Sequence, residues 1–205
     1  MVSSTTGSIM HAANVFESYM PIGTYVSDSL EISETAMVEL PLLADTWVNS
    51  ASGSQTVNFD DYAALIARTT GLDNILLTFD RSALPDQANL ISAELMINVT
   101  LESGAFGKEL TILNSESFDS TTVSFETAPA VFNPSEPVSA AVGMFSFDVL
   151  SNVAAWDAVG AQATADGHID HLAISASGPF GRISMDSLES FEAQAPTLTV
   201  VYFVE

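Results

Sequence analysis

The chain contains no cysteine, and only four of its 205 residues are lysine or arginine. Without cysteine it has no disulfide framework, thiolate metal site, iron–sulfur cluster or cysteine nucleophile. Its 26 acidic residues are almost unopposed, which gives a formal net charge of −22 at pH 7. Charged residues nevertheless make up only 15% of the chain, below the roughly 25% usual for soluble domains. The acidity therefore reflects missing cations more than abundant carboxylates.

The scarcity of cations excludes two classes of partner. Nucleic-acid binding draws much of its affinity from basic residues that displace counterions from phosphates, and anionic membranes attract basic segments in the same way. The four cations are Arg68, Arg81, Lys108 and Arg182. Because four scattered cations cannot build a basic groove, we expect neither nucleic acid nor a membrane as a partner. No apolar run approaches the roughly 20 residues that span a bilayer.

Export signals and catalytic motifs are also missing. Residues 1–8 carry no positive charge, and residues 9–16 are too polar for a signal-peptide core, so we expect a protein made in the cytoplasm without a visible export signal. The chain has no G-x-S-x-G elbow, H-E-x-x-H pair, P-loop or G-x-G-x-x-G. Chance Ser/His/Asp combinations and carboxylate pairs are inevitable in this composition. We therefore expect a protein that is not an enzyme and holds no resident cofactor.

From residue 36 onward, short apolar or alternating runs separated by turn residues indicate β-strands. The hydrophobic fraction of 47% is enough for a folded core. Turn chemistry dominates the segments between the runs, as in residues 83–87, 128–134 and 177–179. The expected strands are 46–49, 63–68, 74–80, 91–101, 109–114, 122–125, 143–148, 171–176, 181–185 and 197–204.

Only one segment has the periodicity of a helix. Between residues 148 and 157, Val149, Val153 and Trp156 stand at the spacing i, i+4 and i+7 of one helical face. Many short strands with one brief helix favour two packed antiparallel sheets over a parallel sheet. The predicted fold class is therefore all-β: an antiparallel jelly-roll-like β-sandwich, residues 36–205, with one short helix.

Residues 1–35 differ from the rest and form a predicted N-terminal arm. They are rich in Ser and Thr and carry no Lys or Arg. Disordered arms are usually poor in aromatic residues, whereas this one holds large apolar side chains. We expect it to dock on its own core or on a neighbouring subunit; the alternative is extra strands on the same domain. The candidate docking residues are Val15, Phe16, Tyr19 and Tyr25.

Two groups of side chains resemble metal ligands. His168, Asp170 and His171 lie close in sequence, but position 171 points opposite to 168 and 170 in a strand, so exposed polar residues after a turn are favoured. Asp60 and Asp61 offer oxygen ligands of the kind that bind Ca²⁺. No EF-hand loop surrounds them, and an ordinary loop before the strand 63–68 is the favoured interpretation.

Three aromatic residues could serve either a sugar-binding surface or the core of the fold. Trp47, Tyr62 and Trp156 are the side chains from which a sugar-stacking platform could be built. The two tryptophans, however, lie in strand and helix patterns whose apolar faces point to a core. Structural use of both is favoured.

Five segments of the chain share one order and spacing. They are Ala44–Val48, Phe79–Pro85 with Ile91–Leu95, Phe118–Phe125 with Ala128-Pro129, Phe147–Trp156 and Ala195–Val200. In this order they resemble the β-sandwich modules called DNRLRE-type domains, a group that overlaps carbohydrate-binding modules and includes alginate binders. The resemblance spans about residues 40–203, and the literal DNRLRE hexapeptide is absent. It implies a jelly-roll-like β-sandwich and, through the relatives, carbohydrate binding.

Three functions remain open from the sequence. The first hypothesis is a non-enzymatic structural protein of a virus particle, a bacteriophage head-decoration (cement) or tail component, whose partners are its own copies and other structural proteins. Its location would be the virion, after synthesis in the host cytoplasm. The alternatives are an extracellular carbohydrate-binding module that binds a polysaccharide, with or without Ca²⁺, and an extracellular filament subunit whose residues 1–35 donate a strand to the next protomer.

Overall fold

The fold was obtained as a computed structural model, which describes residues 35–69, 73–85, 88–156, 169–190 and 194–204. These residues belong to one unit that spans 33–205. The elements are β1 (Thr35–Leu40), β2 (Leu42–Trp47), β3 (Ala64–Arg68), β4 (Ile75–Asp80), β5 (Asn89–Gly104), β6 (Glu109–Ser115), the 3₁₀ turn η1 (Phe125–Thr127), β7 (Val131–Phe132), β8 (Val138–Ser139), β9 (Gly143–Asp148), α1 (Leu150–Ala154), β10 (Ile169–Ser177), β11 (Gly181–Asp186) and β12 (Thr197–Phe203).

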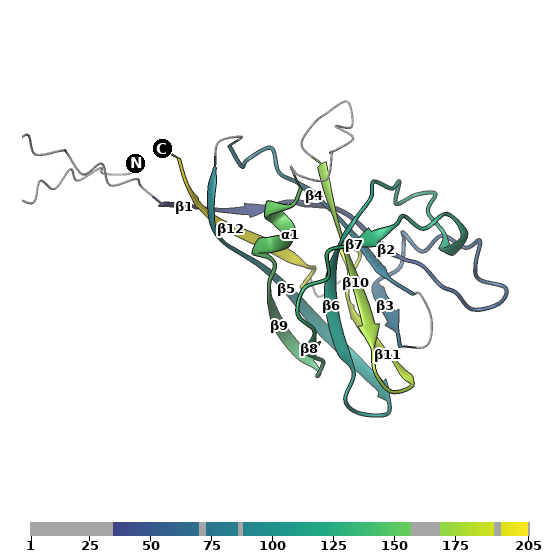
Figure 1. The fold of residues 1–205 in the computed structure, drawn as a ribbon. Helices are drawn as coiled ribbons and strands as arrows, with labels where there is room; N and C mark the ends of the chain where they lie inside the picture. The colour runs from purple at the N-terminus through teal and green to yellow at the C-terminus, as the bar shows by residue number, and fades with distance from the viewer. Residues whose placement is uncertain (1–34, 70–72, 86–87, 157–168, 191–193, 205) are drawn as a thin grey trace, which may run out of the picture. The chain divides into compact units, whose positions relative to one another are not determined.

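Two antiparallel sheets of six strands each form a β-sandwich (Figure 1), so the predicted fold class is confirmed. One sheet is organised around β5, the longest strand with 16 residues. On one side of β5, β12 pairs with its first half and β11 with its second half; β9 pairs with the other side. β1 then extends β12, and β3 extends β11. The second sheet has the order β2-β4-β10-β6-β7, with β8 also paired to β6.

The chain changes sheets at Pro41. β1 pairs with β12 in the first sheet, whereas β2 pairs with β4 in the second. Pro41 cannot donate a hydrogen bond to a ladder, but its carbonyl accepts one from the backbone N–H of Asp80 at 2.9 Å. This corner links the edges of the two sheets and closes one side of the sandwich.

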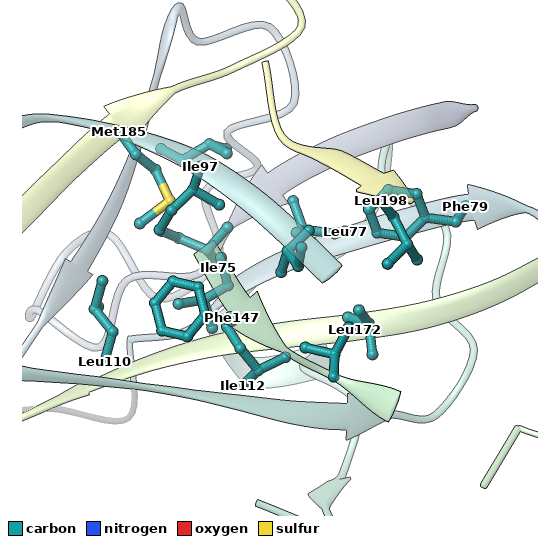
Figure 2. Close-up of a cluster of buried hydrophobic side chains, with 14 of the residues drawn as sticks. Ile75, Leu77, Phe79, Ile97, Leu110, Ile112, Phe147, Leu172, Met185 and Leu198 are labelled. Atoms are coloured by element: carbon teal, nitrogen blue, oxygen red, sulfur yellow. The ribbon is translucent and has the colours of Figure 1, made fainter. Parts of the chain in front are cut away.

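The core fills the space between the sheets (Figure 2). Alternate side chains of β5 and β4 point inward, as the two-residue period of a strand requires: Leu95, Ile97, Ile75 and Leu77 are fully buried. Phe147 of β9 packs among them. Burial of this kind stabilises a fold by roughly 25 cal/mol per Å² of apolar surface.

A smaller apolar cluster lies on the other side of the second sheet. Leu76 and Ala173 point away from the main core and are covered by Val123, with Phe118 and Phe125 packed around them. The segment 116–130 therefore covers the outer face of β4 and β10. This face of the sheet is not exposed to solvent, which explains why β4 is apolar on both sides.

Several strand predictions differ from the structure. The predicted strand 46–49 is β2, which begins earlier at Leu42 and ends at Trp47, and the short strands β7 and β8 were not expected. Residues 122–125 are not a strand but the end of a turn that leads into η1. The carboxylate of Asp119 accepts hydrogen bonds from the N–H and hydroxyl of Thr121, and the backbone carbonyl of Asp119 accepts from the N–H groups of Thr122 and Val123.

β1 was not expected: Met37 on it is 74% exposed, and only Leu40 at its end is fully buried, with Val38 half-buried against the core. The predicted helix, 148–157, is shorter, at Leu150–Ala154.

The predicted boundary between arm and sandwich, after residue 35, stays a prediction. Apart from Thr35, which begins β1, the arm lies outside the described residues. In the part of the chain that is described, no helix has the length and apolar character needed to cross a membrane.

Candidate functional site

The three aromatic residues weighed as a sugar platform do not share a surface. Trp47 is only 3% exposed; its ring stacks on Phe59 with centroids 4.0 Å apart, and the guanidinium carbon of Arg68 lies 5.6 Å from the ring centre. Tyr62, 51% exposed, meets the edge of Phe59 at 5.1 Å. Trp156 is 4% exposed and follows α1. Both tryptophans thus serve the core, as the strand and helix patterns predict.

Trp156 lines a pocket of about 210 Å³ between α1 and the segment that follows β4. At this pocket the Nε of Arg81 makes an ion pair with the Oδ2 of Asp170, at 2.8 Å. A planar guanidinium beside an apolar wall is suited to a small polar molecule with one apolar face. The lining residues are Arg81, Leu84, Pro85, Ala88, Leu90, Val153 and Trp156.

The predicted group of His168, Asp170 and His171 does not come together as a metal site. His168 lies outside the described residues. Asp170 pairs with Arg81, whereas His171 points to the opposite face, where its Nδ1 lies 3.1 Å from the Thr78 hydroxyl and its ring 4.8 Å from that of Phe118. Burial lowers the pKa of His171 to about 4, so the imidazole is neutral at physiological pH.

Asp60 and Asp61 lie in a loop whose geometry is set by Asn58. The Asn58 amide nitrogen donates to the carbonyls of Ser120 and Val123, at 2.5 and 2.8 Å, and its oxygen accepts from the N–H of Asp60. The polar atoms of Asn58 are thereby used in holding the loop to the covering segment 116–130. Across the described ranges, no three His, Asp or Glu side chains gather as a metal site. Ca²⁺ binding at Asp60 and Asp61 stays a prediction.

Asp45 of β2 is a buried carboxyl that the sequence pattern did not single out. Desolvation raises its pKa to about 7, and the negative charges of Glu189 and Asp60 act in the same direction, against a hydrogen bond from the N–H of Leu188 at 2.9 Å. Its side chain also interacts with that of Glu189. With 1% of its surface exposed, Asp45 is inaccessible to a substrate and acts as a structural group.

The most exposed aromatic side chains of the described residues lie together at one end of the sandwich. Phe106 is 89% exposed and Phe180 76%. They lie in the turns β5–β6 and β10–β11, which both pass from one sheet to the other and run side by side at the lower end in Figure 1. The N–H of Ala105 donates to the carbonyl of Phe180 at 3.1 Å, which joins the two turns. We call these two turns, 104–108 and 178–181, the apolar tip.

Glycines allow the two turns to pack this closely. Gly178 has a φ of +101°, and a side chain there would place its Cβ 2.8 Å from the carbonyl oxygen of Gly107, a contact that side chains do not tolerate. Thr69, after β3, fastens the second turn: its hydroxyl donates to the carbonyl of Pro179 at 2.8 Å and accepts from the N–H of Gly181 at 3.0 Å. These hydrogen bonds and the close packing of the glycines hold the backbone of the second turn in one conformation.

A buried lysine supports the first turn from inside. The side chain of Lys108 is fully buried; its ammonium donates to Glu102 at 3.2 Å and to the carbonyl of Ala105. A buried ammonium is costly unless it is paired and hydrogen-bonded, and both conditions hold here. The phenyl ring of Phe106 thus projects from a turn whose backbone is held from the inside by hydrogen bonds of Lys108.

The tip is also the end of the molecule where cations gather. Three of the four lysines and arginines lie at it: Arg182 is exposed and pairs in register with Arg68, and Lys108 lies beneath. Arg68 and Lys108 are balanced by Asp73 and Glu102. In a chain of net charge −22, three of the four cations are therefore concentrated at this end.

A repeated sequence signal marks the tip. Each turn carries the pattern Gly-x-Phe-Gly, as Gly104-Ala-Phe-Gly107 and Gly178-Pro-Phe-Gly181. A large apolar side chain between two glycines has no strand or helix face to join, so it indicates an exposed aromatic residue on a tight turn. The docking residues predicted from the sequence do not include these two phenylalanines. The docking residues that were predicted, Val15, Phe16, Tyr19 and Tyr25, lie outside the described residues.

Comparisons with known proteins add little about function. No family model matches the chain, and no curated protein matches it. Among solved structures, the chain is similar to a xylan-binding module, CBM15, with 14% sequence identity and a TM-score of 0.36, over 84% of this chain and 99% of that one. A TM-score of this size says nothing about what this chain binds. The two sheets themselves make the chain an antiparallel β-sandwich, while membership of the DNRLRE-type group stays a prediction.

Proposed function

We propose that the chain is a non-enzymatic subunit of a larger assembly, and that the assembly is a virus particle, with a bacteriophage head-decoration or tail position. The observation that carries the proposal is the apolar tip. Phe106 and Phe180, two of the largest apolar side chains, are held exposed on turns fastened from inside by Lys108. Exposed aromatic side chains on two turns that are joined to each other are typical of a protein–protein contact.

Electrostatics supports the same proposal. Two molecules of net charge −22 repel one another over most of their surface. The repulsion is weakest at the tip, where Arg68, Lys108 and Arg182 offset nearby carboxylates. An acidic surface also avoids packaged nucleic acid, which suits a protein on the outside of a filled particle. Charge therefore favours attachment through one end of the molecule.

The groups with shifted pKa values support a non-catalytic role. Asp45 and His171 are two buried titratable residues whose pKa values are shifted, that of Asp45 upward and that of His171 downward. Their exposed fractions are 1% and 7%, and each contacts other side chains of the fold. General acid–base catalysis requires a group within hydrogen-bond reach of a substrate. Neither residue meets that requirement.

Mass spectrometry of purified particles tests the viral assignment. Particles banded from a culture that carries the gene should contain the chain in a fixed ratio to the major shell protein, through successive density gradients. A matched preparation from a strain in which the gene is deleted provides the control. Particles that never contain the chain, or contain it in traces that gradients remove, would contradict the proposal.

A carbohydrate-binding function is the second candidate, and the pocket beside Trp156 is the observation that favours it. Its size of about 210 Å³ and its mixed lining of Arg81 and apolar side chains suit one sugar ring. Calorimetric titration with neutral and anionic polysaccharides, with and without Ca²⁺, tests it. Saturable heat that Leu84→Trp abolishes by filling the pocket would support this candidate; no heat with any polysaccharide would remove it.

A further inference from the structure

The apolar tip and the pocket beside Trp156 lie at opposite ends of the sandwich. Leu90, near the start of β5, lines the pocket, and Gly104, at the end of the same strand, begins the tip. The 16 residues of β5, at about 3.3 Å per residue, span roughly 50 Å. Figure 1 shows the two turns of the tip at the lower end, well away from α1. Because β5 is held in the sheet by β9, β11 and β12, the tip cannot enter the pocket of its own molecule.

The pocket has the size and the walls that suit a phenyl ring. Its volume is about 210 Å³, and apolar cavities of about 150 Å³ accept a benzene ring. Leu84, Leu90 and Val153 supply aliphatic walls. Trp156 supplies an aromatic wall, and the guanidinium of Arg81 a cationic one, two kinds of group that pack favourably against an aromatic ring.

Phe106 is the side chain of the tip that is best placed to enter a pocket. It is 89% exposed, more than any other large apolar side chain of the described residues. Its neighbours in the turn are Ala105 and Gly107, which are small enough to let the backbone approach a concave surface. Phe180, 76% exposed, follows the bulkier Pro179 and would cover the rim of the pocket.

The charges at the two ends are complementary. At the tip, Arg182 is an exposed cation. At the pocket, Arg81 is paired with Asp170, while Asp80 precedes Arg81 and Asp148 accepts a hydrogen bond from the first residue of α1. A contact between tip and pocket therefore joins unlike charges, whereas a contact between two tips brings two Arg182 side chains together.

We propose that Phe106 of one copy enters the pocket beside Trp156 of a second copy, so that the chain assembles head to tail. This inference rests on the proposed assembly function and names its contact. A contact between two different surfaces of identical molecules is heterologous, and it produces rings when the rotation closes and filaments when it does not. In a filament, one tip and one pocket remain available at the two ends for other structural proteins.

Three full-length variants test the contact. Phe106→Ser removes the ring, Leu84→Trp fills the pocket, and Ala88→Glu places a carboxylate at the pocket wall. Either pocket variant suffices, and circular dichroism with thermal unfolding shows which of them is folded. The matched controls are Met144→Ser, which removes a 52% exposed apolar side chain from β9, and Ser82→Trp, which adds an indole at an exposed position close to Leu84. Sedimentation velocity measures the species formed by each protein and by mixtures.

The expected pattern is specific to a contact between ring and pocket. The unaltered chain and both controls form oligomers that grow with concentration. Phe106→Ser and the pocket variants, each alone, stay monomeric at these concentrations, because loss of an aromatic anchor weakens association by about 30-fold or more. An equal mixture of Phe106→Ser with a pocket variant forms dimers and nothing larger, since one intact ring and one intact pocket make a single contact.

Two results of the same measurement would overturn the contact. Self-association of a folded pocket variant by itself would show that the tip binds somewhere other than the pocket. An unaltered chain that remains monomeric at all concentrations would show that the chain does not associate through either surface.

Further outcomes separate this inference from the two candidate functions. Saturable heat with a polysaccharide that Leu84→Trp abolishes, together with a mixture that forms no dimer, would assign the pocket to a sugar and overturn the contact. If particles contain the chain but the mixture forms no dimer, the contact is wrong and the viral function stands. If the dimer forms but particles never contain the chain, the contact stands and the viral function is wrong.

Discussion

At the scale of single residues, two buried titratable groups respond to pH in opposite directions. Asp45 has its pKa raised to about 7 by desolvation, and His171 has its pKa lowered to about 4 by burial. The folded state holds a proton on Asp45 that the unfolded chain has released by neutral pH. The folded state leaves His171 unprotonated in mild acid, where the unfolded chain binds a proton on this residue. Each group therefore gives its own pH dependence of the free energy of unfolding.

Asp45→Asn is expected to stabilise the fold more at pH 8 than at pH 5. Between the unfolded value of 3.8 and the folded value of about 7, the native state binds more protons, so the contribution of Asp45 to stability falls as pH rises through this window. Asparagine stays neutral and keeps an oxygen for the N–H of Leu188. Urea unfolding at both pH values measures the difference, with Asp61→Asn, at an exposed carboxylate, as control. An equal effect at both pH values would contradict the raised pKa.

His171→Asn is expected to remove a loss of stability in acid. In the unfolded chain His171 titrates near 6.5 and in the fold near 4, so the unfolded state binds more protons in this window and stability falls as pH falls. The shift corresponds to about 3 kcal/mol between pH 7 and pH 4. The pH dependence of unfolding for the unaltered chain minus that for the variant isolates this part from the many carboxylates. Parallel curves would show that His171 is not shifted.

At the scale of elements, alternation and turn residues predicted most of the sandwich. β5 and β9 agree with their predicted segments because they bury alternate residues, and β11 agrees although it buries three residues in a row, Ile183 to Met185. β1 was missed because only Val38 and Leu40 of this edge strand face the core, which is too short an alternation to mark a strand. The segment 122–125 was mistaken for a strand because its apolar residues cover the outer face of the second sheet, a position that resembles strand alternation in sequence.

The tip is an element whose shape depends on one buried cation. Lys108→Met keeps the length and apolar stem of the side chain but leaves Glu102 and the carbonyl of Ala105 without their donor. A loss of about 2–4 kcal/mol in the free energy of unfolding is expected. Hydrogen exchange should also accelerate at the N–H of Ala105, which donates to Phe180. The matched control Arg182→Met, at an exposed cation nearby, should change the free energy of unfolding by less than about 0.5 kcal/mol.

A milder outcome would revise this account of the tip. If Lys108→Met leaves both the stability and the exchange at Ala105 unchanged, the ammonium does not hold the first turn. Hydrogen bonds from Lys108 would then not be what holds the turn that carries Phe106. The glycines of the two turns would be the remaining cause of its conformation.

At the scale of the whole molecule, charge and apolar surface are distributed unevenly. Counting residues revealed the net charge of −22 but not that three of the four cations meet at one end. That gathering depends on β3, β5 and β11, which are distant in sequence and neighbours in the sheet. For the same reason, the adjacency of Phe106 and Phe180 could not be inferred before the pairing of the strands was known, although each Gly-x-Phe-Gly turn could.

The tip is the surface that the account assigns to assembly, and hydroxyl-radical footprinting tests that assignment most directly. In the isolated chain, Phe106 and Phe180 should oxidise readily, Phe147 in the core hardly at all, and Leu43, 48% exposed, at an intermediate rate. In the assembled particle, oxidation of Phe106 and Phe180 should fall several-fold while Leu43 keeps its rate. Equal oxidation of both phenylalanines in the free and assembled protein would contradict the central claim.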